Sequence, residues 1–423
     1  MKRIPHRTAV SIGLAGAALG FAVRVFSAPW LDEPLRADSS GTSPTHFRPC
    51  GGGLALTVDT RDLADVVGFF QSVYQFSAGV EMGWNGDTAN CVPGATTPAY
   101  LDATLLRVNY FRAMAGLPGD ITFNATYNQK CQMAALMMSA QDMLSHYPAF
   151  TWTCYTADGA DAAGHSNLML GSAGPDAVDG YMDDAGGANY AVGHRRWVLY
   201  PNQVEMGAGS VPGILDTDGS ILYEAANALW VVSDPPPPPR TNALEYIAWP
   251  PAGYVPYQVL PLASGRWSLS WAAADFSGAG VAMMCGGTNV SAVLEIVRDG
   301  YADNTLVWRP QLPAAAELIG ATCQVVVTNI VAEGSVRAVS YAVTIIDPQS
   351  VAILLTVKPL SGHDFELSWP AGSSSFSLYE ADILGSGTNW TPAVEVAPVL
   401  TNGVYRAVVG AEKPRRFYRL EGH

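Results

Sequence analysis

A run of five prolines, Pro235 to Pro239, divides the 423-residue chain into two parts with different sequence patterns. Proline has a fixed φ angle and no backbone N–H, so consecutive prolines favour an extended polyproline II conformation and continue neither a helix nor a strand ladder. Such a run is typical of a stiff spacer. We therefore expect a linker at residues 235–239, and a chain of this length predicts about two to four domains.

Upstream of the prolines, the sequence mixes helical and strand patterns. Three segments have apolar residues spaced for one buried helical face, and two shorter segments have strand composition. The predicted helices are the one capped by Asp59-Thr60, Leu101 to Ala115, and Thr126 to Ser145. The predicted strands are Glu205 to Val211 and Ala226 to Val232. Between them, Asp216 to Gly219 is expected to form a hairpin turn, because the rest of a calcium loop is absent.

Downstream of the prolines, apolar residues alternate with period two, as in strands with one buried face. The clearest examples are Trp267 to Trp271, Val281 to Cys285, Cys323 to Thr328 and Ser340 to Ile345. This pattern predicts an antiparallel β-sandwich module at residues 240–348 and a C-terminal one at residues 350–421. The predicted fold class is therefore α+β, a mixed domain followed by two all-β (immunoglobulin-like) sandwich modules.

The N-terminus has the pattern of an export signal. Lys2, Arg3 and Arg7 precede an apolar run from Ala9 to Val23 that is too short to span a bilayer comfortably. We expect residues 1–28 to be a signal peptide, and the mature protein to be secreted, extracellular or at the cell surface. No later segment is apolar enough to serve as a transmembrane anchor.

The charge balance excludes some partners. The chain has 23 Lys and Arg against 37 Asp and Glu, a formal net charge of −14, and no basic patch. This balance argues against nucleic acid or an anionic membrane as a partner. The sequence gives no indication of oligomeric state.

Six cysteines suit an oxidising compartment. No pair has the close spacing of a zinc knuckle, so disulfides are the preferred interpretation. The connectivity stays open from sequence alone. The simplest hypothesis pairs nearest neighbours, as Cys50–Cys91, Cys131–Cys154 and Cys285–Cys323.

Two histidines, His146 and His194, are the strongest candidates for a functional site. His146 follows the third predicted helix, His194 opens a later segment, and Ser166-Asn167 lies between them. Histidine is a common metal ligand and changes its charge near neutral pH. We expect the two imidazoles to line one cleft.

The order of motifs around these histidines resembles the CAP (SCP) superfamily of cysteine-rich secretory proteins, antigen 5 and plant pathogenesis-related proteins. The matching segments are Val108 to Gly116, the Ala-rich helix before His146, Ser166-Asn167-Leu168, Tyr181 to Asp184, Gly193-His194-Arg195 and Met206 to Gly209. The last two look most like bacterial members. The resemblance implies an α-β-α sandwich with a central antiparallel sheet, in a domain at residues 45–232 that includes an N-terminal extension.

The resemblance also implies a site. Family members place two histidines and two glutamates around a central cleft that sometimes holds a divalent ion. The histidines match His146 and His194, Ser166 stands where the family has a glutamate, and Asp184, then Asp183, is the nearest candidate for the second. The candidate ligand-binding residues are His146, Ser166, Asn167, Asp184 and His194, with zinc or calcium at the histidines. The missing carboxylate predicts weakened metal binding.

Three functions agree with this sequence. The family resemblance favours a binding protein for a lipid, peptide or cell-envelope ligand, with the β modules as spacers or attachment units. The second is a metal-dependent hydrolase, a protease or esterase, in which the histidines hold zinc and Asp184 activates water, or in which Ser166 attacks with a histidine as base. The third is an adhesive or structural surface protein. Binding is preferred, and enzymatic activity is left open.

Overall fold

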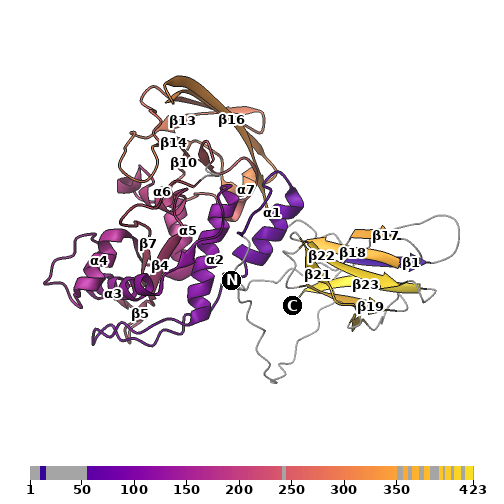
Figure 1. The fold of residues 1–423 in the computed structure, drawn as a ribbon, viewed down its shortest axis with the longest axis horizontal. Coiled ribbons are helices and arrows are strands. Elements are labelled where there is room, and N and C mark those ends of the chain that lie inside the picture. The colour runs from indigo at the N-terminus through magenta and orange to yellow at the C-terminus, as the bar shows by residue number, and fades with distance from the viewer. Residues whose placement is uncertain are drawn as a thin grey trace. The chain divides into compact units, whose positions relative to one another are not determined.

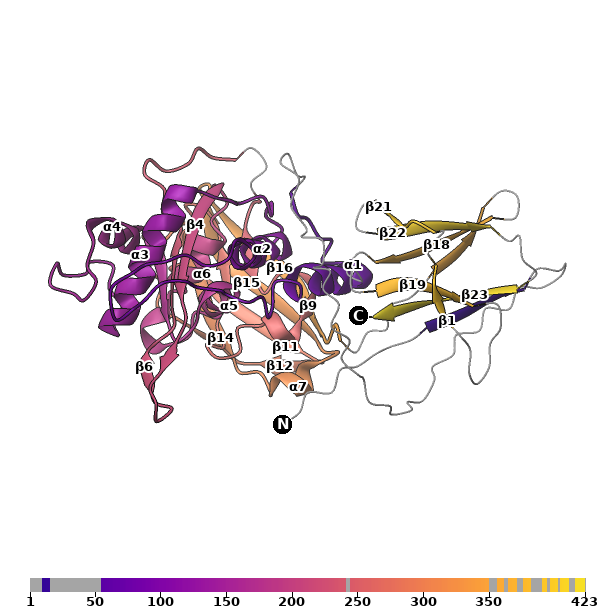
Figure 2. The ribbon, with the colours of Figure 1, turned by 90° about the horizontal axis from the view of Figure 1, so that it is seen from below.

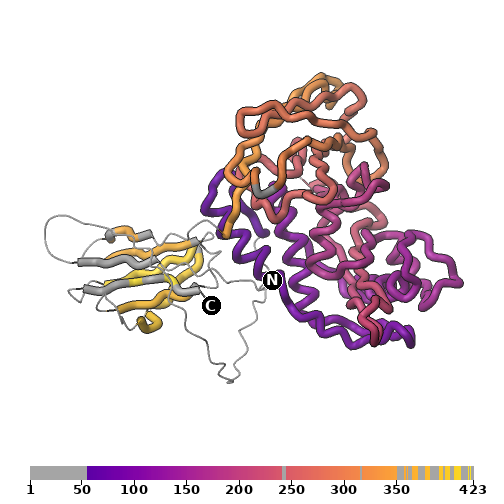
Figure 3. Tube along the Cα trace, turned by 180° about the vertical axis from the view of Figure 1, so that it is seen from behind, coloured from indigo at the N-terminus to yellow at the C-terminus, as the bar shows by residue number. Residues whose placement is uncertain are grey.

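The computed structural model of the chain is shown in Figures 1 and 3. It describes residues 10–15, 55–240 and 244–349, and between residues 356 and 422 the segments 356–360, 364–370, 376–381, 390–393, 396–401, 404–410 and 415–422. The chain divides into two compact units, one of residues 50–63 and 73–347, the other of residues 1–49, 64–72 and 348–423. No helix in the described residues is long and apolar enough to cross a membrane.

The first unit contains a four-stranded sheet in the order β2-β4-β7-β3. Its strands are β2 (Thr122–Phe123), β4 (Glu205–Val211), β7 (Ala226–Trp230) and β3 (Ser166–Leu170). β7 is antiparallel to both β4 and β3, and β2 is parallel to β4. The predicted strand at Glu205 to Val211 is confirmed at both ends, whereas the strand predicted to reach Val232 ends at Trp230.

Helices cover both faces of this sheet. They are α2 (Pro98–Met114), α3 (Ala125–Gln141), α4 (Ala157–His165), α5 (Gly174–Asp183) and α6 (Gly193–Val198). Figure 2 shows α3 and α4 on one side of the sheet, and α2 and α5 on the other. Alternation along β4 explains the arrangement, because Gly209 lies against α3 while the hydroxyl of Ser210 accepts a hydrogen bond from Gly174 at the start of α5. The resulting α-β-α layers agree with the predicted α+β class.

Local signals set the starts of α2 and α3 and the end of α3. Thr97 and Asn124 cap α2 and α3 by accepting backbone N–H groups, and Pro98 occupies the first turn of α2. The prediction that the third helix reaches Ser145 is wrong, because α3 ends at Gln141 and Asp142 takes the left-handed conformation with φ 51°. A left-handed residue of this kind is a frequent helix stop, and Asp adopts it more readily than most residues.

Two shorter predicted features also appear in the structure. β5 (Ile214–Leu215) and β6 (Ile221–Tyr223) form the hairpin expected around Asp216 to Gly219. The helix expected after Asp59-Thr60 is α1 (Leu63–Phe69), which continues as a π-helix at Phe70–Tyr74.

The first unit continues beyond the prolines into two packed β-sheets. One sheet has the order β13-β14-β10-β8 and the other has the order β12-β11-β15-β16-β9. The strands of the first are β13 (Ala292–Leu294), β14 (Thr305–Pro310), β10 (Trp267–Ser270) and β8 (Ile247–Trp249). Those of the second are β12 (Thr288–Val290), β11 (Gly280–Cys285), β15 (Thr322–Ala332), β16 (Ser335–Ile346) and β9 (Gly253–Pro256). Buried Trp249, Trp308, Val325 and Val343 contribute to the core, and the predicted all-β region is present.

The second unit contains two four-stranded sheets. One comprises β17 (Thr356–Pro359), β18 (Asp364–Pro370), β22 (Val404–Gly410) and β21 (Val399–Thr401). The other comprises β1 (Val10–Ala15), β23 (Arg415–Gly422), β19 (Phe376–Ala381) and β20 (Thr391–Pro392). Leu367 and Trp369, two positions apart in β18, are both buried, as residues on one face of a strand are. β1 lies inside the predicted signal peptide, and the remainder of residues 1–28 lies outside the described residues.

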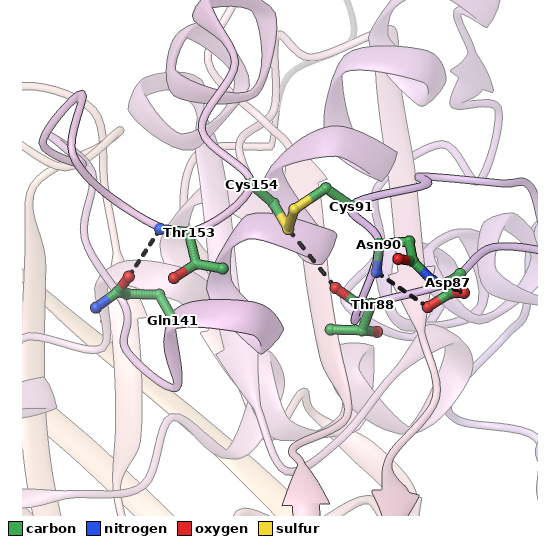
Figure 4. Close-up of a disulfide and its surroundings, with 7 residues drawn as sticks. All are labelled: Asp87, Thr88, Asn90, Cys91, Gln141, Thr153 and Cys154. Carbon is green, nitrogen blue, oxygen red and sulfur yellow. Dashed lines mark hydrogen bonds between the residues drawn. A yellow bond between two sulfur atoms is a disulfide. The ribbon is translucent and has the colours of Figure 1, made fainter.

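Two disulfides, Cys91–Cys154 and Cys285–Cys323, are present among the described residues (Figure 4 shows the first). The Cys285–Cys323 pairing is confirmed. The Cys131–Cys154 pairing is wrong, because Cys131 is a buried free thiol facing the sheet from α3, 3.6 Å from the hydroxyl of Ser166. The predicted Cys50–Cys91 pairing is wrong as well, since Cys91 bonds Cys154, and Cys50 lies outside the described residues.

Candidate functional site

Asp184 holds the side chain of His194. Asp184 follows α5 in the left-handed conformation, with φ 56°, and its side chain is fully buried. One carboxylate oxygen lies 2.7 Å from Nδ1 of His194, and the other accepts the backbone N–H of His194 at 2.9 Å and of Arg195 at 3.4 Å. These donors meet the carboxylate because Gly193 and His194 open helix α6, where backbone N–H groups have no intrahelical acceptor.

Buried polar residues of β3, β7 and α5 fix the other side of His194. The side-chain amide of Asn167 donates to the carbonyl of His194 at 3.0 Å. The hydroxyl of Tyr181 contacts the carbonyl of Asn167 at 3.0 Å and the side chain of Asn227 at 2.8 Å, and its ring centroid lies 5.5 Å from that of His194. Tyr181, Asn167 and Asn227 are buried, so this network positions the histidine backbone rigidly.

His146 lies in the loop between α3 and α4. Its Nδ1 is 2.8 Å from the carbonyl oxygen of Ala163 in α4, and the residue is exposed. The disulfide Cys91–Cys154 closes the end of this loop, and Thr153 donates its backbone N–H to the side chain of Gln141 at 2.9 Å (Figure 4). The loop is therefore anchored at both ends although it carries exposed side chains.

The hydrogen bonds define which ring nitrogen of each histidine is left for a ligand. A carbonyl or carboxylate oxygen only accepts, so Nδ1 of a neutral His146 or His194 carries the proton. In the described part of the chain, the hydrogen bonds of both rings use Nδ1, which leaves the lone pair of Nε2 for a ligand. His194 has 25% of its side chain exposed.

The start of β3 links the two histidines. Asn167 in β3 contacts His194, and Ala163, four positions earlier, contacts His146, so the two anchoring residues lie within about 14 Å of each other. β3 is the edge strand of its sheet. His146 approaches this edge from the layer of α3 and α4, and His194 approaches it from the layer of α5 and α6.

Ser166 and Asn167 point to opposite faces of the sheet, as neighbours in a strand do. The hydroxyl of Ser166 faces the thiol of Cys131 in α3, and its residue is 4% exposed, while Asn167 faces Tyr181 and His194. The structure therefore brings Asn167, Asp184 and His194 together directly. Burial raises the pKa of the Cys131 thiol to about 12, so Ser166 has a neutral neighbour.

The residues present do not complete a metal site of the expected kind. Both histidines have the outer hydrogen bond to oxygen that metal-binding histidines usually make. However, a catalytic zinc ion takes at least three protein ligands. Among the described residues, no three or more His, Cys, Asp or Glu side chains are grouped to hold a metal ion. The two imidazoles alone supply too few donors, so no chemistry is assigned to a metal here.

Asp183, the other carboxylate candidate, has a different environment. Its two oxygens accept the backbone N–H groups of Ala263 and Ser264 at 2.9 and 2.8 Å. Asp183 therefore binds the segment before β10 rather than either histidine.

Sequence reasoning missed the contribution of buried arginines around this site. Arg195 is 1% exposed, and its guanidinium donates to the carbonyls of Met182, Asp183 and Arg266. Burial lowers the pKa of Arg195 to about 10, which still leaves it charged at neutral pH. Its position beside a candidate histidine was the only sequence signal, because its acceptors here are backbone carbonyls, which no side-chain pattern identifies.

A second buried arginine stabilises α5 through an ion pair. Arg107 of α2 pairs with Asp179 of α5, and the hydroxyl of Tyr74 donates to the same carboxylate at 3.0 Å. Burial raises the pKa of Asp179, an effect that the charge of Arg107 opposes. This contact fixes the helix whose C-terminal end carries Asp184.

Comparisons with known proteins assign this region to a family. A search of curated proteins gave no match for the chain. The family model described as the cysteine-rich secretory protein family (CAP) matches residues 105–218, from within α2 through both histidines to the hairpin after β4. The chain therefore contains a CAP domain at residues 105–218.

Proposed function

We propose that the protein is secreted and that its CAP domain binds a lipid, peptide or cell-envelope ligand at the edge of β3, through His146 and His194. The proposal rests on one observation, that both imidazole rings use the same nitrogen for their hydrogen bond to the protein. Each has Nδ1 bonded to a protein oxygen, and each leaves Nε2 as an acceptor beside the same strand end.

Exposed apolar side chains next to His146 support binding rather than a purely structural role. Tyr147 is 91% exposed and Phe150 is 81% exposed, and Met143 and Leu144 of the same loop are also exposed. Exposed apolar side chains that are grouped on a surface mark contact sites more often than singly scattered ones do. The two disulfides agree with an oxidising compartment.

The binding proposal is tested with defined probes. The purified full chain is sedimented with phosphatidylcholine vesicles, with phosphatidylglycerol vesicles and with isolated peptidoglycan, and a peptide mixture is tested by affinity capture. We expect one probe class to bind the wild type, and His146→Ala and His194→Ala to reduce that binding by about tenfold or more.

His165→Ala is the matched control for these variants. His165 lies at the end of α4, but its ring stacks on that of Trp230, with ring centroids 4.6 Å apart. Its Nδ1 is 2.8 Å from the backbone carbonyl oxygen of Asp161. We expect the control to bind as the wild type does. Equal binding by the wild type and both site variants, or no binding of any probe class, would overturn the proposal.

One geometric feature favours hydrolysis as a second candidate function. A buried carboxylate that holds Nδ1–H of a histidine and leaves Nε2 free is the arrangement of a general base. Asp184 would then orient His194 instead of activating water itself. Incubation with casein and with a nitrophenyl ester tests this candidate, which predicts turnover that is lost in His194→Ala and retained in His165→Ala. A protein without turnover on either substrate would contradict it.

A further inference from the structure

The C-terminal end of α5 is bound by two buried guanidinium groups from different parts of the first unit. Arg195 donates to the carbonyls of Met182 and Asp183, at 2.7 and 3.1 Å. Arg266, just before β10 in the β module, donates from Nη1 to the carbonyls of Asp184 and Gly186, both at 3.0 Å. The last carbonyls of a helix lack intrahelical partners and carry partial negative charge, so buried cations stabilise them.

Arg266 is itself held firmly. It is 6% exposed, and its Nε donates to Glu295 at 3.1 Å. Its own carbonyl accepts a hydrogen bond from Arg195 at 2.9 Å. The segment before it is attached as well, because the carboxylate of Asp183 accepts the N–H groups of Ala263 and Ser264. The β module therefore contacts residues 183–186 in two ways, through the guanidinium of Arg266 and through the backbone N–H groups of Ala263 and Ser264.

These contacts act on the residue that orients His194. Asp184 has a left-handed backbone, which costs aspartate more than it costs glycine, so neighbouring contacts help to hold it. Arg266 bonds the carbonyl of Asp184 while the side chain of the same residue bonds Nδ1 of His194. Without Arg266, the backbone of Asp184 can relax and carry its carboxylate away from the ring.

We propose that Arg266 of the β module is a positioning residue for His194, acting through Asp184, so that the site of the CAP domain is complete only with the β module attached. The inference rests on the proposed function only in treating His194 as a ligand contact. It changes the role of residues 240–348 from a spacer or attachment unit to a part of the site.

The test reads the proton position on the His194 ring in the full chain. Long-range ¹H–¹⁵N spectra of ¹⁵N-histidine protein at pH 8 separate a protonated Nδ1 from an unprotonated Nε2, and His194→Gln assigns the signals. The wild type is expected to show a single form with Nδ1 protonated. Arg266→Met is expected to lose this single form, so that the ¹⁵N chemical shifts of Nδ1 and Nε2 of His194 move toward each other. Arg266→Lys is expected to give an intermediate shift, because one ammonium replaces the planar fork.

Arg309→Met is the matched control. Arg309 bonds the same Glu295 oxygen at 2.9 Å, but it is half exposed and belongs to β14. It should leave the His194 spectrum unchanged. A wild-type spectrum in Arg266→Met overturns the proposal. If that variant does not fold, a wild-type spectrum in Arg266→Lys overturns it, and failure of both variants to fold shows a general structural role instead. The readout needs no ligand, so a negative binding assay leaves this result standing.

Discussion

A single buried carboxylate determines the geometry around His194. Asp184→Ala leaves the backbone N–H groups of His194 and Arg195, and the ring N–H, without their acceptor. We expect the free energy of unfolding to fall by about 2–4 kcal/mol, because unmatched buried donors keep their desolvation cost. Urea denaturation measures the change. Asp216→Ala, at an exposed turn, should cost less than about 1 kcal/mol. Equal losses in the two variants would contradict this account of Asp184.

Cys131 predicts a specific alkaline pH dependence. Its ordinary pKa of 9.0 applies to the unfolded chain, and burial raises the folded pKa to about 12. As pH rises above 9, the unfolded state loses this proton while the folded state keeps it. Stability therefore falls with pH, by up to about 1.4 kcal/mol per pH unit. The contribution is fully present below pH 9 and is lost as pH approaches 12.

Cys131→Ala isolates this effect. The stability advantage of the wild type over the variant should shrink as pH rises from 9 to 10, below the range in which Tyr100, with a folded pKa of about 12, contributes. Chemical denaturation is done without a reducing agent, and non-reducing peptide mapping checks that the unfolded-state thiolate of Cys131 has not exchanged with either disulfide. Parallel pH curves for the two proteins would show that the thiol ionises equally in both states.

At the scale of secondary-structure elements, the contact between β4 and α3 depends on glycine. A Cβ atom at Gly209 would lie 2.1 Å from the backbone nitrogen of Gln132, a distance that requires the helix to move. We expect Gly209→Ala to destabilise the protein by about 1–3 kcal/mol or more. Gly278→Ala, where a Cβ meets nothing within 4 Å, is the control and should leave the thermal midpoint nearly unchanged. Similar midpoints for both variants would mean that α3 and β4 pack less closely.

The sequence predicted elements better than it predicted the directions of side chains. Periodicity placed β4 at both ends, because the signal is local. The end of α3 was misplaced, since the helical apolar pattern continues past Asp142, where the backbone turns left-handed. Ser166 and Asn167 were expected in one site, but strand geometry points them to opposite faces. Arg266 carried no local signal at all, because its partners lie about eighty residues earlier in the chain.

At the scale of the whole molecule, the pairing of Cys91 depends on proximity in the fold and not on distance along the sequence, whereas Cys285 pairs with its nearest neighbour, Cys323. Cys91 and Cys154 are 63 positions apart, whereas Cys131 is enclosed between α3 and the sheet and has no cysteine partner. Residues on the two sides of the proline run are in contact. Arg240, directly after it, donates to Asp120 and Asn202 of the CAP region. The fold class was predictable from patterns, but the contacts between the CAP domain and the β module were not.

Export predicts a shortened chain. If residues 1–28 are a signal peptide, intact mass measurement of the protein released by its source cells should give a chain that begins near residue 29. Strand β1 would then be absent from the mature sheet, and β23 would become its edge. A released chain that still contains Val10–Ala15, or retention of the whole protein inside the cell, would contradict the export prediction.

The central claim is that His146 and His194 present their Nε2 atoms to one ligand. Zinc alone is a suitable geometric probe, because one ion bridges two imidazoles only when their nitrogens lie within about 4 Å of each other. In calorimetric titrations we predict one weak site, and we predict that His146→Ala and His194→Ala each weaken it by about tenfold or more, whereas His165→Ala does not. Zinc binding that is the same in the wild type and both site variants would contradict the claim.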